Sequence, residues 1–360
     1  MLVAHDGIAI RVDAPDDDRT WLAEFLEPAY SQPATDGECV RVSFEEAADA
    51  TLASAGDAGL RVAFALDSEA VRLPAAPLAG GLRLCDLEAG VVFEVGAGGR
   101  ETRLRYGGSR LAARMRLMRV VREYAHNHSL RSGGVILHAA AVTSARRALA
   151  VAGAKGSGKT TLALRLLETP GTAYLANDRV LVRPDAEPWA VGIPTVITLR
   201  AGTLALLPEM GSRLRRCGDF RQHREERAAR GPSPAVEIEG GLRVSAAQLC
   251  TALGRRAEAT APLVAVLFPA PGRGAGSPLR RLEVDEAAAA LAESLLGRGS
   301  GTFASEVFVG TPGPTPGEAE LRSRCRALAS RIPCYACGLS DGASAEDAAA
   351  LLRRCLETDA

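Results

Sequence analysis

Apolar and polar residues alternate over short stretches in the first hundred residues of the chain. Four runs of this kind, separated by Gly, Asp and Pro, lie at 7–12, 39–44, 60–66 and 90–95. Alternation with a period of two is typical of β-strands that bury one face, and Gly and Pro mark the turns between strands. The pattern therefore predicts a strand-rich N-terminal region with one short helix over 21–30.

The pattern becomes helical between Ser109 and His128. Apolar residues recur there every three or four positions, and arginines fill many of the remaining ones. This periodicity predicts a helix that packs one face against the protein. Two interpretations of the arginines stay open: they are solvated on the outer face, or they form a surface for an acidic substrate.

From residue 134 onward, strands are predicted to alternate with helices and turns. Apolar runs at 134–142 and 147–153 predict a hairpin, and its second strand leads through a glycine-rich turn into a helix over 160–168. Further strands are predicted at 173–178, 179–184, 191–200, 261–270 and 333–339, and further helices at 285–296 and 318–332. The alternation indicates an α/β fold.

The length of 360 residues fits two domains. We expect a mixed α+β N-terminal domain over 1–130 and an α/β domain over 131–360. Residues 211–234 stand out in the second domain because they are dense in charge and almost free of apolar residues. This segment is predicted to be an exposed loop or a partly ordered helix.

The overall charge excludes two classes of partner. The formal net charge is +0, so the protein as a whole is not attracted to nucleic acid or to an anionic membrane. No apolar run reaches the roughly 18 residues of a membrane span, and the first residues lack the pattern of a signal peptide. We therefore expect a cytoplasmic protein whose eight cysteines are reduced thiols.

Cys334 and Cys337 form a C-x-x-C pair. The sequence has no second pair of this kind and no histidine nearby, so four zinc ligands do not come together locally. Two interpretations stay open: the cysteines are buried thiols of a strand, or they serve redox or metal chemistry.

Both lysines of the chain lie in one glycine-rich stretch, and every other basic residue is an arginine. Residues 153–160, GAKGSGKT, match the phosphate-binding pattern G-x-x-x-x-G-K-[ST] between a predicted strand and a predicted helix. Lys159 is expected to reach the β- and γ-phosphates, and Thr160 to bind Mg²⁺. Lys155 either covers the phosphates or is a solvated turn residue. The residues expected to bind ATP are Gly153, Ala154, Lys155, Gly156, Ser157, Gly158, Lys159, Thr160 and Thr161.

Two large classes of nucleotide-binding protein do not fit. A GTPase needs an N-K-x-D motif to read the base, and this chain has no lysine outside the glycine-rich stretch. A transporter ATPase needs an LSGGQ-like signature, which the sequence lacks. An adenylate-kinase-like phosphotransferase stays open because 211–234 is rich in arginine.

Around the glycine-rich stretch the chain resembles the HPr kinase/phosphorylase family and its stand-alone relatives found beside peptide natural-product pathways. The residues ILHAAAV, AGAKGSGKTTLALRLLE and YLANDRVLV carry this resemblance, which is strongest over 134–210. In that family a histidine precedes the hairpin and two acidic residues follow the helix. His138 matches the histidine and Asp178 the second acid, whereas Asn177 replaces the first.

The resemblance implies a P-loop core, of the kind shared with phosphoenolpyruvate carboxykinases, and an ATP- and Mg²⁺-dependent kinase. The acceptor would be a hydroxyl of a peptide, a protein or a small molecule. Asp178 would bind Mg²⁺ with Thr160 and take the acceptor proton, and His138 would lie beside the γ-phosphate, with Lys159 as the third catalytic residue. The family's multimers imply a homo-oligomer.

Purely structural interpretations of the same residues stay open. Asp178 is otherwise a helix cap, and His138 is otherwise a buried core histidine. For the whole protein, the alternatives are a regulator that binds ATP or ADP without transferring phosphate, and a scaffold whose nucleotide-binding loop has no function.

Overall fold

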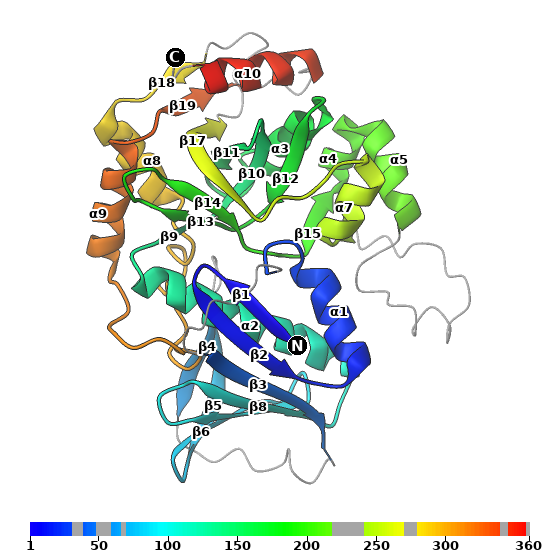
Figure 1. Cartoon of the computed structure of the whole chain (residues 1–360), viewed down its shortest axis with the longest axis vertical. Helices are drawn as coiled ribbons and strands as arrows, with labels where there is room; N and C mark the ends of the chain where they lie inside the picture. The colour runs from blue at the N-terminus through cyan, green and yellow to red at the C-terminus, as the bar shows by residue number, and fades with distance from the viewer. Residues whose placement is uncertain are drawn as a thin grey trace. The chain divides into compact units, whose positions relative to one another are not determined.

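An α/β arrangement with mixed sheets is seen in the computed structural model of the chain (Figure 1). This confirms the predicted α/β class. The structure describes residues 1–30, 39–47, 59–65, 70–217, 241–269, 279–338 and 345–357. The chain divides into two units, Met1–Ile136 with Leu295–Leu321, and Leu137–Ser294 with Arg322–Ala360.

The first unit is built on an eight-stranded sheet with the order β1-β2-β3-β8-β7-β6-β5-β4. The pairs β2–β3 and β3–β8 are parallel, and the other neighbours are antiparallel. Burial alternates along the strands, as the period of two predicted. The strands are β1 (Leu2–His5), β2 (Ile8–Asp13), β3 (Cys39–Glu46), β4 (Leu60–Ala65), β5 (Ala70–Leu78), β6 (Gly81–Asp86), β7 (Val91–Gly96) and β8 (Glu101–Tyr106).

Helices α1 (Asp16–Leu26) and α2 (Arg110–Arg131) belong to the same unit. Helix α2 confirms the helix predicted from Ser109 and packs against strands β2, β3, β4 and β8. Ser109 caps its first turn by accepting a hydrogen bond from the backbone N–H of Ala112 at 3.4 Å. Helix α1 begins earlier than the predicted 21–30, because three aspartates occupy its first turn and favour a helix start there.

Of the two interpretations of the α2 arginines, the solvated outer face is wrong for Arg110, Arg114 and Arg116. Asp18 of α1 is fully buried, and the Nε atoms of Arg114 and Arg110 lie 2.6 Å and 3.0 Å from its Oδ1. Arg116 Nε lies 2.5 Å from Asp86 Oδ2. These arginines neutralise carboxylates that come from other elements, and the periodicity of one helix cannot reveal such partners.

The segment 295–321 also lies in the first unit, although it falls within the range 131–360 predicted for the second domain. Its Phe308 is fully buried and stacks on Phe64 of β4 with the ring centroids 5.6 Å apart. Asn127 Nδ2 of α2 donates to the Phe308 carbonyl at 2.6 Å. This stretch is rich in Gly and Pro and has no periodic pattern. The sequence therefore does not indicate that the chain returns to the first unit.

The second unit contains strands in the order β12-β10-β11-β17-β14-β13. Strand β10 is antiparallel to both β11 and β12, and β17 is parallel to β11 and β19. Its strands are β10 (Ala139–Ser144), β11 (Arg147–Ala152), β12 (Thr172–Ala176), β13 (Val180–Arg183), β14 (Trp189–Gly192), β17 (Thr260–Pro269), β18 (Arg280–Arg281) and β19 (Cys334–Cys337). Strands β15 (Ile197–Arg200) and β16 (Gly241–Val244) pair separately, and β9 (Val135–Leu137) spans the division between the units.

The predicted hairpin of 134–142 with 147–153 is confirmed for β10 and β11. The first run, however, is interrupted at His138, which separates β9 from β10. The backbone N–H of His138 donates to the carbonyl of Ser294 at 2.7 Å instead of joining a strand ladder. The predicted strand 191–200 is likewise divided, because Pro194 has no N–H to offer a sheet.

Helices cover the sheet of the second unit. Helix α3 packs against β10, β11 and β12, and α10 packs against α3, as seen at the top of Figure 1. Residues 211–217 belong to helix α5, and the rest of the predicted charged segment 211–234 lies outside the described residues. The helices are α3 (Lys159–Glu168), α4 (Ala201–Leu206), α5 (Pro208–Cys217), α7 (Ala246–Leu253), α8 (Val284–Glu293), α9 (Glu318–Ala329) and α10 (Ala345–Glu357).

The cysteines of the C-x-x-C pair are buried on strand β19, which confirms the first of their two interpretations. Burial raises the pKa of both Cys334 and Cys337 to about 12. At pH 8 only about one thiol in 10⁴ is then ionised, and the thiolate is the reactive form. Within the described ranges, no group of three or more His, Cys, Asp or Glu side chains is arranged to hold a metal ion.

This burial predicts a selective labelling pattern. We expect iodoacetamide at pH 8 to modify the exposed Cys39 of the native protein within minutes, and to leave Cys334 and Cys337 unmodified. Peptide mass spectrometry before and after unfolding in guanidinium measures this. Rapid labelling of Cys334 in the native protein would show that the thiol is accessible and ionised, against the burial described here.

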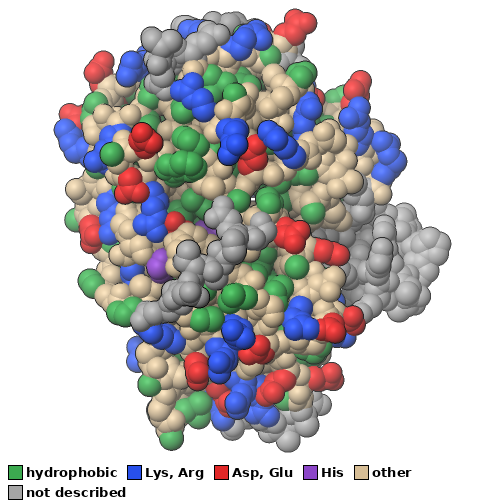
Figure 2. Space-filling model, in the orientation of Figure 1, with side chains coloured by type: hydrophobic (Ala, Val, Ile, Leu, Met, Phe, Trp, Pro, Cys, Tyr) green, Lys and Arg blue, Asp and Glu red, His purple; other side chains and the backbone are tan. Residues whose placement is uncertain are grey.

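Every helix in the described part of the chain is too short or too polar to cross a lipid bilayer. Acidic and basic side chains are interspersed on the face that Figure 2 shows. This mixture fits the formal net charge of +0.

Candidate functional site

The glycine-rich loop 153–158 joins the end of β11 to the start of α3. Gly153, Gly156 and Gly158 have φ angles of +146°, +86° and +92°, which residues with a Cβ rarely adopt. A Cβ on Gly153 would also lie 3.0 Å from Ser157 Oγ. The backbone course of this loop therefore requires glycine at these positions, and the sequence provides it.

Helix α3 begins at Lys159, directly after this loop, and has no side-chain cap at its start. The first N–H groups of a helix have no partner within the helix, and the helix dipole makes this end positive. An anion bound there would accept hydrogen bonds from several N–H groups at once. The loop and the helix start thus offer backbone donors and positive charge in one place.

The two lysines of the loop differ in their surroundings. Lys159 is only 6% exposed, and its Nζ donates to the carbonyls of Gly153 and Ala154 at 2.8 Å and 2.9 Å. These bonds hold the ammonium group over the loop. Lys155, by contrast, is exposed. The predicted phosphate contact of Lys159 therefore requires a short movement of a group that is already in the loop.

The hydroxyl groups around the loop are also placed differently from one another. Ser157 Oγ is enclosed and has no hydrogen-bond partner among the described residues. Thr160 is partly buried in the first turn of α3. Thr161 Oγ1 lies 3.2 Å from Thr203 Oγ1 of α4, so this hydroxyl already has a partner within the protein.

His138 and Asp178 are joined by a hydrogen bond. His138 Nε2 donates to Asp178 Oδ1 at 3.1 Å. The histidine side chain is 14% exposed and the aspartate side chain 44%. His138 lies just before β10, and Asp178 follows β12, which is a neighbour of β10 in the sheet. The sheet therefore brings together two residues that are forty positions apart in the chain.

The environment of Asp178 keeps its carboxyl group ionised. Burial alone would raise the pKa of this group, but the hydrogen bond from His138 and the charges of Arg179 and Lys159 outweigh burial and lower the pKa to about 2. Asp178 is thus an anion at neutral pH. It holds its charge because positive groups surround it.

The glycine-rich loop and Asp178 lie at the same edge of the sheet. Strands β11 and β12 are both antiparallel to β10, so they run in the same direction and end at the same edge. The loop follows β11, and Asp178 follows β12. Lys159 is close enough to Asp178 for its charge to lower the pKa of that carboxyl group. The topology therefore brings the predicted catalytic residues Lys159, His138 and Asp178 to one region.

Sequence reasoning gave Arg179 no role, yet this residue lies directly beside Asp178. It is 4% exposed, and its Nε and Nη1 have no hydrogen-bond partner among the residues that the structure describes. In the sequence Arg179 is a charged residue before the apolar run 180–182, and the family resemblance matches it to the residue after the second acid without giving it a role. Charged residues are common at strand ends, so the burial of Arg179 could not be predicted from the sequence.

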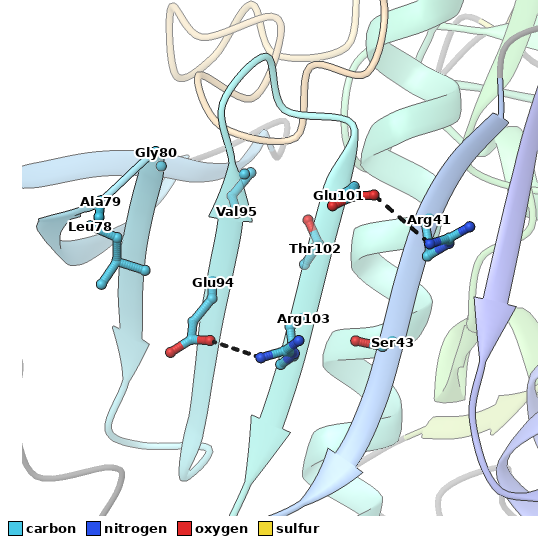
Figure 3. A pocket seen from close by; sticks show the side chains of 12 residues that line it. Arg41, Ser43, Leu78, Ala79, Gly80, Glu94, Val95, Glu101, Thr102 and Arg103 are labelled. Atoms are coloured by element: carbon cyan, nitrogen blue, oxygen red, sulfur yellow. Dashed lines mark ion pairs between the residues drawn. The ribbon is translucent and has the colours of Figure 1, made fainter.

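The first unit contains a separate cavity of about 500 Å³ on the open face of its sheet (Figure 3). Arg41 pairs with Glu101 at 3.9 Å there, and Arg103 pairs with Glu94 at 3.9 Å. The charged groups of this cavity thus neutralise one another. None of the predicted site residues lines it.

No protein-family model matches the chain, and no curated protein matches it either. The assignment of a function therefore depends on the residues and the geometry described above.

Proposed function

We propose that the protein is an ATP- and Mg²⁺-dependent kinase that transfers the γ-phosphate to a hydroxyl group. One observation carries the proposal: a loop with three left-handed glycines opens into a helix start with Lys159, at the same sheet edge as the ionised Asp178. Phosphoryl transfer needs a phosphate cradle, positive charge and a carboxylate near the acceptor. This region supplies all three. In this proposal the second unit has a P-loop core like that of the HPr kinase family.

The glycine-rich loop binds the triphosphate in this proposal. The N–H groups of residues 154–160 donate to the phosphate oxygens, and Lys159 exchanges its bonds to the Gly153 and Ala154 carbonyls for contacts with the β- and γ-phosphates. A compact ammonium on a flexible stem suits this exchange better than the broad guanidinium of arginine. This explains why an arginine-rich chain has lysine here.

The oxygen ligands present near the loop fit Mg²⁺. Thr160 and Asp178 would hold the ion, because Mg²⁺ prefers hard oxygen ligands of this kind. The ion would neutralise charge on the phosphates.

Asp178 receives the acceptor's proton. The hydroxyl oxygen forms a bond to the γ-phosphorus, the bond from that phosphorus to the β,γ-bridging oxygen breaks, and ADP leaves with the electron pair. The proton passes from the hydroxyl to Asp178. A carboxylate with a pKa of about 2 is a weak base, so its main contribution is to orient the hydroxyl. This suits a transition state in which the new bond forms late.

The second candidate is a regulator that binds ATP or ADP without transferring phosphate. The residue Asn177, half-buried beside Asp178, favours it, because a second carboxylate is missing where the kinase family has one. The low basicity of Asp178 also fits this candidate.

Incubation with Mg²⁺ and ATP labelled at the γ-phosphate separates these candidates. The acceptors are a degenerate peptide library with a central Ser or Thr, a matched library with Ala, and free serine and threonine. We expect label in an acid-stable product only where a hydroxyl is present. If the protein binds Mg·ATP and labels none of these, the regulator is the better description.

A further inference from the structure

Arg179 is the most unusual charged residue near the proposed site. A buried guanidinium normally pairs with a carboxylate or with carbonyls, because charged donors that are cut off from water without a partner cost free energy. Arg179 is 4% exposed, and two of its nitrogens, Nε and Nη1, are enclosed without an acceptor among the described residues. It also makes no ion pair within 4 Å there, not even with Asp178.

A second unpartnered group comes from the neighbouring strand. Thr195 is 6% exposed, and its Oγ1 is enclosed without a hydrogen-bond partner in the described ranges. Arg179 immediately precedes β13, and Thr195 follows β14, which pairs with β13 through Val180 and Gly192. The backbone N–H of Ile193 donates to the Arg179 carbonyl at 3.2 Å. Both groups therefore lie at the same end of this strand pair.

The charged groups that act on the Asp178 carboxylate include two basic side chains, so positive charge is in excess among them. Lys159, Arg179 and the start of α3 are positive, and Asp178 is the negative group on which both side chains act. An added oxyanion would balance the positive charge and accept hydrogen bonds that the protein leaves unmade. Guanidinium presents parallel donors that match two oxygens of a phosphate or a carboxylate.

We propose that Arg179 and Thr195 form a second set of oxyanion donors beside Asp178, in addition to the donors of the glycine-rich loop. The site takes a phosphate or carboxylate group, with the guanidinium donating to two oxygens and the Thr195 hydroxyl to one. The existence of this site does not depend on the proposed function, but the identity of its ligand does. Under the proposed function, the ligand is the terminal phosphate of ATP or an acidic group carried by the acceptor.

The test uses the full chain and isothermal titration calorimetry. Four proteins are compared: wild type, Arg179→Met, Thr195→Val and the control Arg256→Met. Arg256 is an arginine of the same unit whose side chain is 69% exposed and pairs with Glu258 at 3.1 Å. Each protein is titrated with Mg·ADP and with the magnesium complex of the β,γ-imido analogue of ATP. Each is also titrated with inorganic phosphate, once without nucleotide and once in the presence of that analogue.

The terminal phosphate of ATP is the ligand if Arg179→Met weakens binding of the imido analogue about tenfold or more and changes binding of Mg·ADP by less than about threefold. A hydrogen bond to a charged group typically accounts for such a loss. An acidic group of the acceptor is the ligand if both nucleotides bind normally and inorganic phosphate binds the analogue complex about tenfold more weakly. Arg256→Met should change neither the affinity for the nucleotides nor the affinity for inorganic phosphate.

The thermal stability of the variants separates a binding role from a structural one. Because Arg179 and Thr195 leave their donors unpaired in the protein, we expect Arg179→Met and Thr195→Val to melt at or above the wild-type temperature while they bind the oxyanion more weakly. A lower melting temperature with unchanged binding would overturn the site. If Arg179→Met does not fold, Thr195→Val and Arg179→Lys decide.

The titrations distinguish an error in the oxyanion site from an error in the proposed kinase activity. If wild type binds inorganic phosphate through Arg179 but binds no magnesium nucleotide, the kinase proposal fails and the oxyanion site stands. If Arg179→Met and Thr195→Val bind the imido analogue and inorganic phosphate as wild type does, the oxyanion site is wrong and the kinase proposal is untouched.

Discussion

Asp178→Asn is expected to slow phosphoryl transfer by about 10²–10⁴-fold, the usual contribution of a positioned base, while the affinity for Mg·ATP stays within about threefold of wild type. Asparagine has nearly the same shape and keeps an oxygen for the hydrogen bond from His138 Nε2, which lies 3.1 Å from Asp178 Oδ1. It carries no charge, so it orients the hydroxyl less strongly than the carboxylate does, and it cannot accept the proton of the hydroxyl. Initial rates of label transfer at saturating ATP, combined with calorimetry, measure both quantities.

The control is Asp185→Asn, which removes an exposed carboxylate of the same unit and should leave transfer unchanged. Transfer by Asp178→Asn within tenfold of wild type would show that another group takes the proton. The pH dependence gives a further check. Because the pKa of Asp178 is lowered to about 2 from 3.8, the group stays ionised as the pH falls from 8 to 4, and its contribution to stability is lost only between about pH 4 and pH 2.

Lys159→Met is the second large expected effect: affinity for Mg·ATP falls about 10–100-fold, and transfer falls at least as much. In the proposed complex the lysine provides charge-assisted hydrogen bonds to two phosphates, each of which typically contributes about 1.5–3 kcal/mol. Methionine keeps the apolar stem and removes the ammonium group, so the loss reports on charge and not on packing. Calorimetry and the transfer assay are the measurements.

Lys159→Arg provides the matched comparison. It keeps the positive charge but replaces a compact ammonium with a planar fork, so we expect it to recover part of the affinity and little of the transfer. Circular dichroism should confirm that both variants are folded, since the Gly153 and Ala154 carbonyls lose the Nζ donor. Binding of Mg·ATP by Lys159→Met at wild-type strength would remove this lysine from the nucleotide site.

The local parts of the fold could be predicted from the sequence. The helical period that begins after Ser109 and the alternation along β3 and β8 identify a helix and two strands from a local pattern. The burial of α2 on all sides between Val120 and Asn127 could not be predicted, because it depends on the other elements that pack around the helix. The break of the first hairpin strand at His138 could not be predicted, because a backbone bond to Ser294, far along the chain, causes it. The buried partners of the α2 arginines are hidden from sequence for the same reason.

In the candidate site, too, some features could be predicted from the sequence and others could not. The spacing of Gly153, Gly158 and Lys159 predicts the loop, since the motif itself determines which positions need left-handed backbone. The hydrogen bond between His138 and Asp178 depends on the order of strands in the sheet, and only the resemblance to a kinase family pointed to that pair. The position of Arg179 beside Asp178 is visible in the sequence, but the burial of its donors could not be predicted from it.

Titration of the 360-residue chain with Mg·ATP, and in parallel with Mg²⁺ and adenosine, tests the central claim most directly. If the glycine-rich loop binds a triphosphate beside Asp178, calorimetry will record saturable binding of Mg·ATP and at least about 100-fold weaker binding of adenosine. Folded protein that takes up no Mg·ATP, or that binds adenosine equally well, would contradict the account.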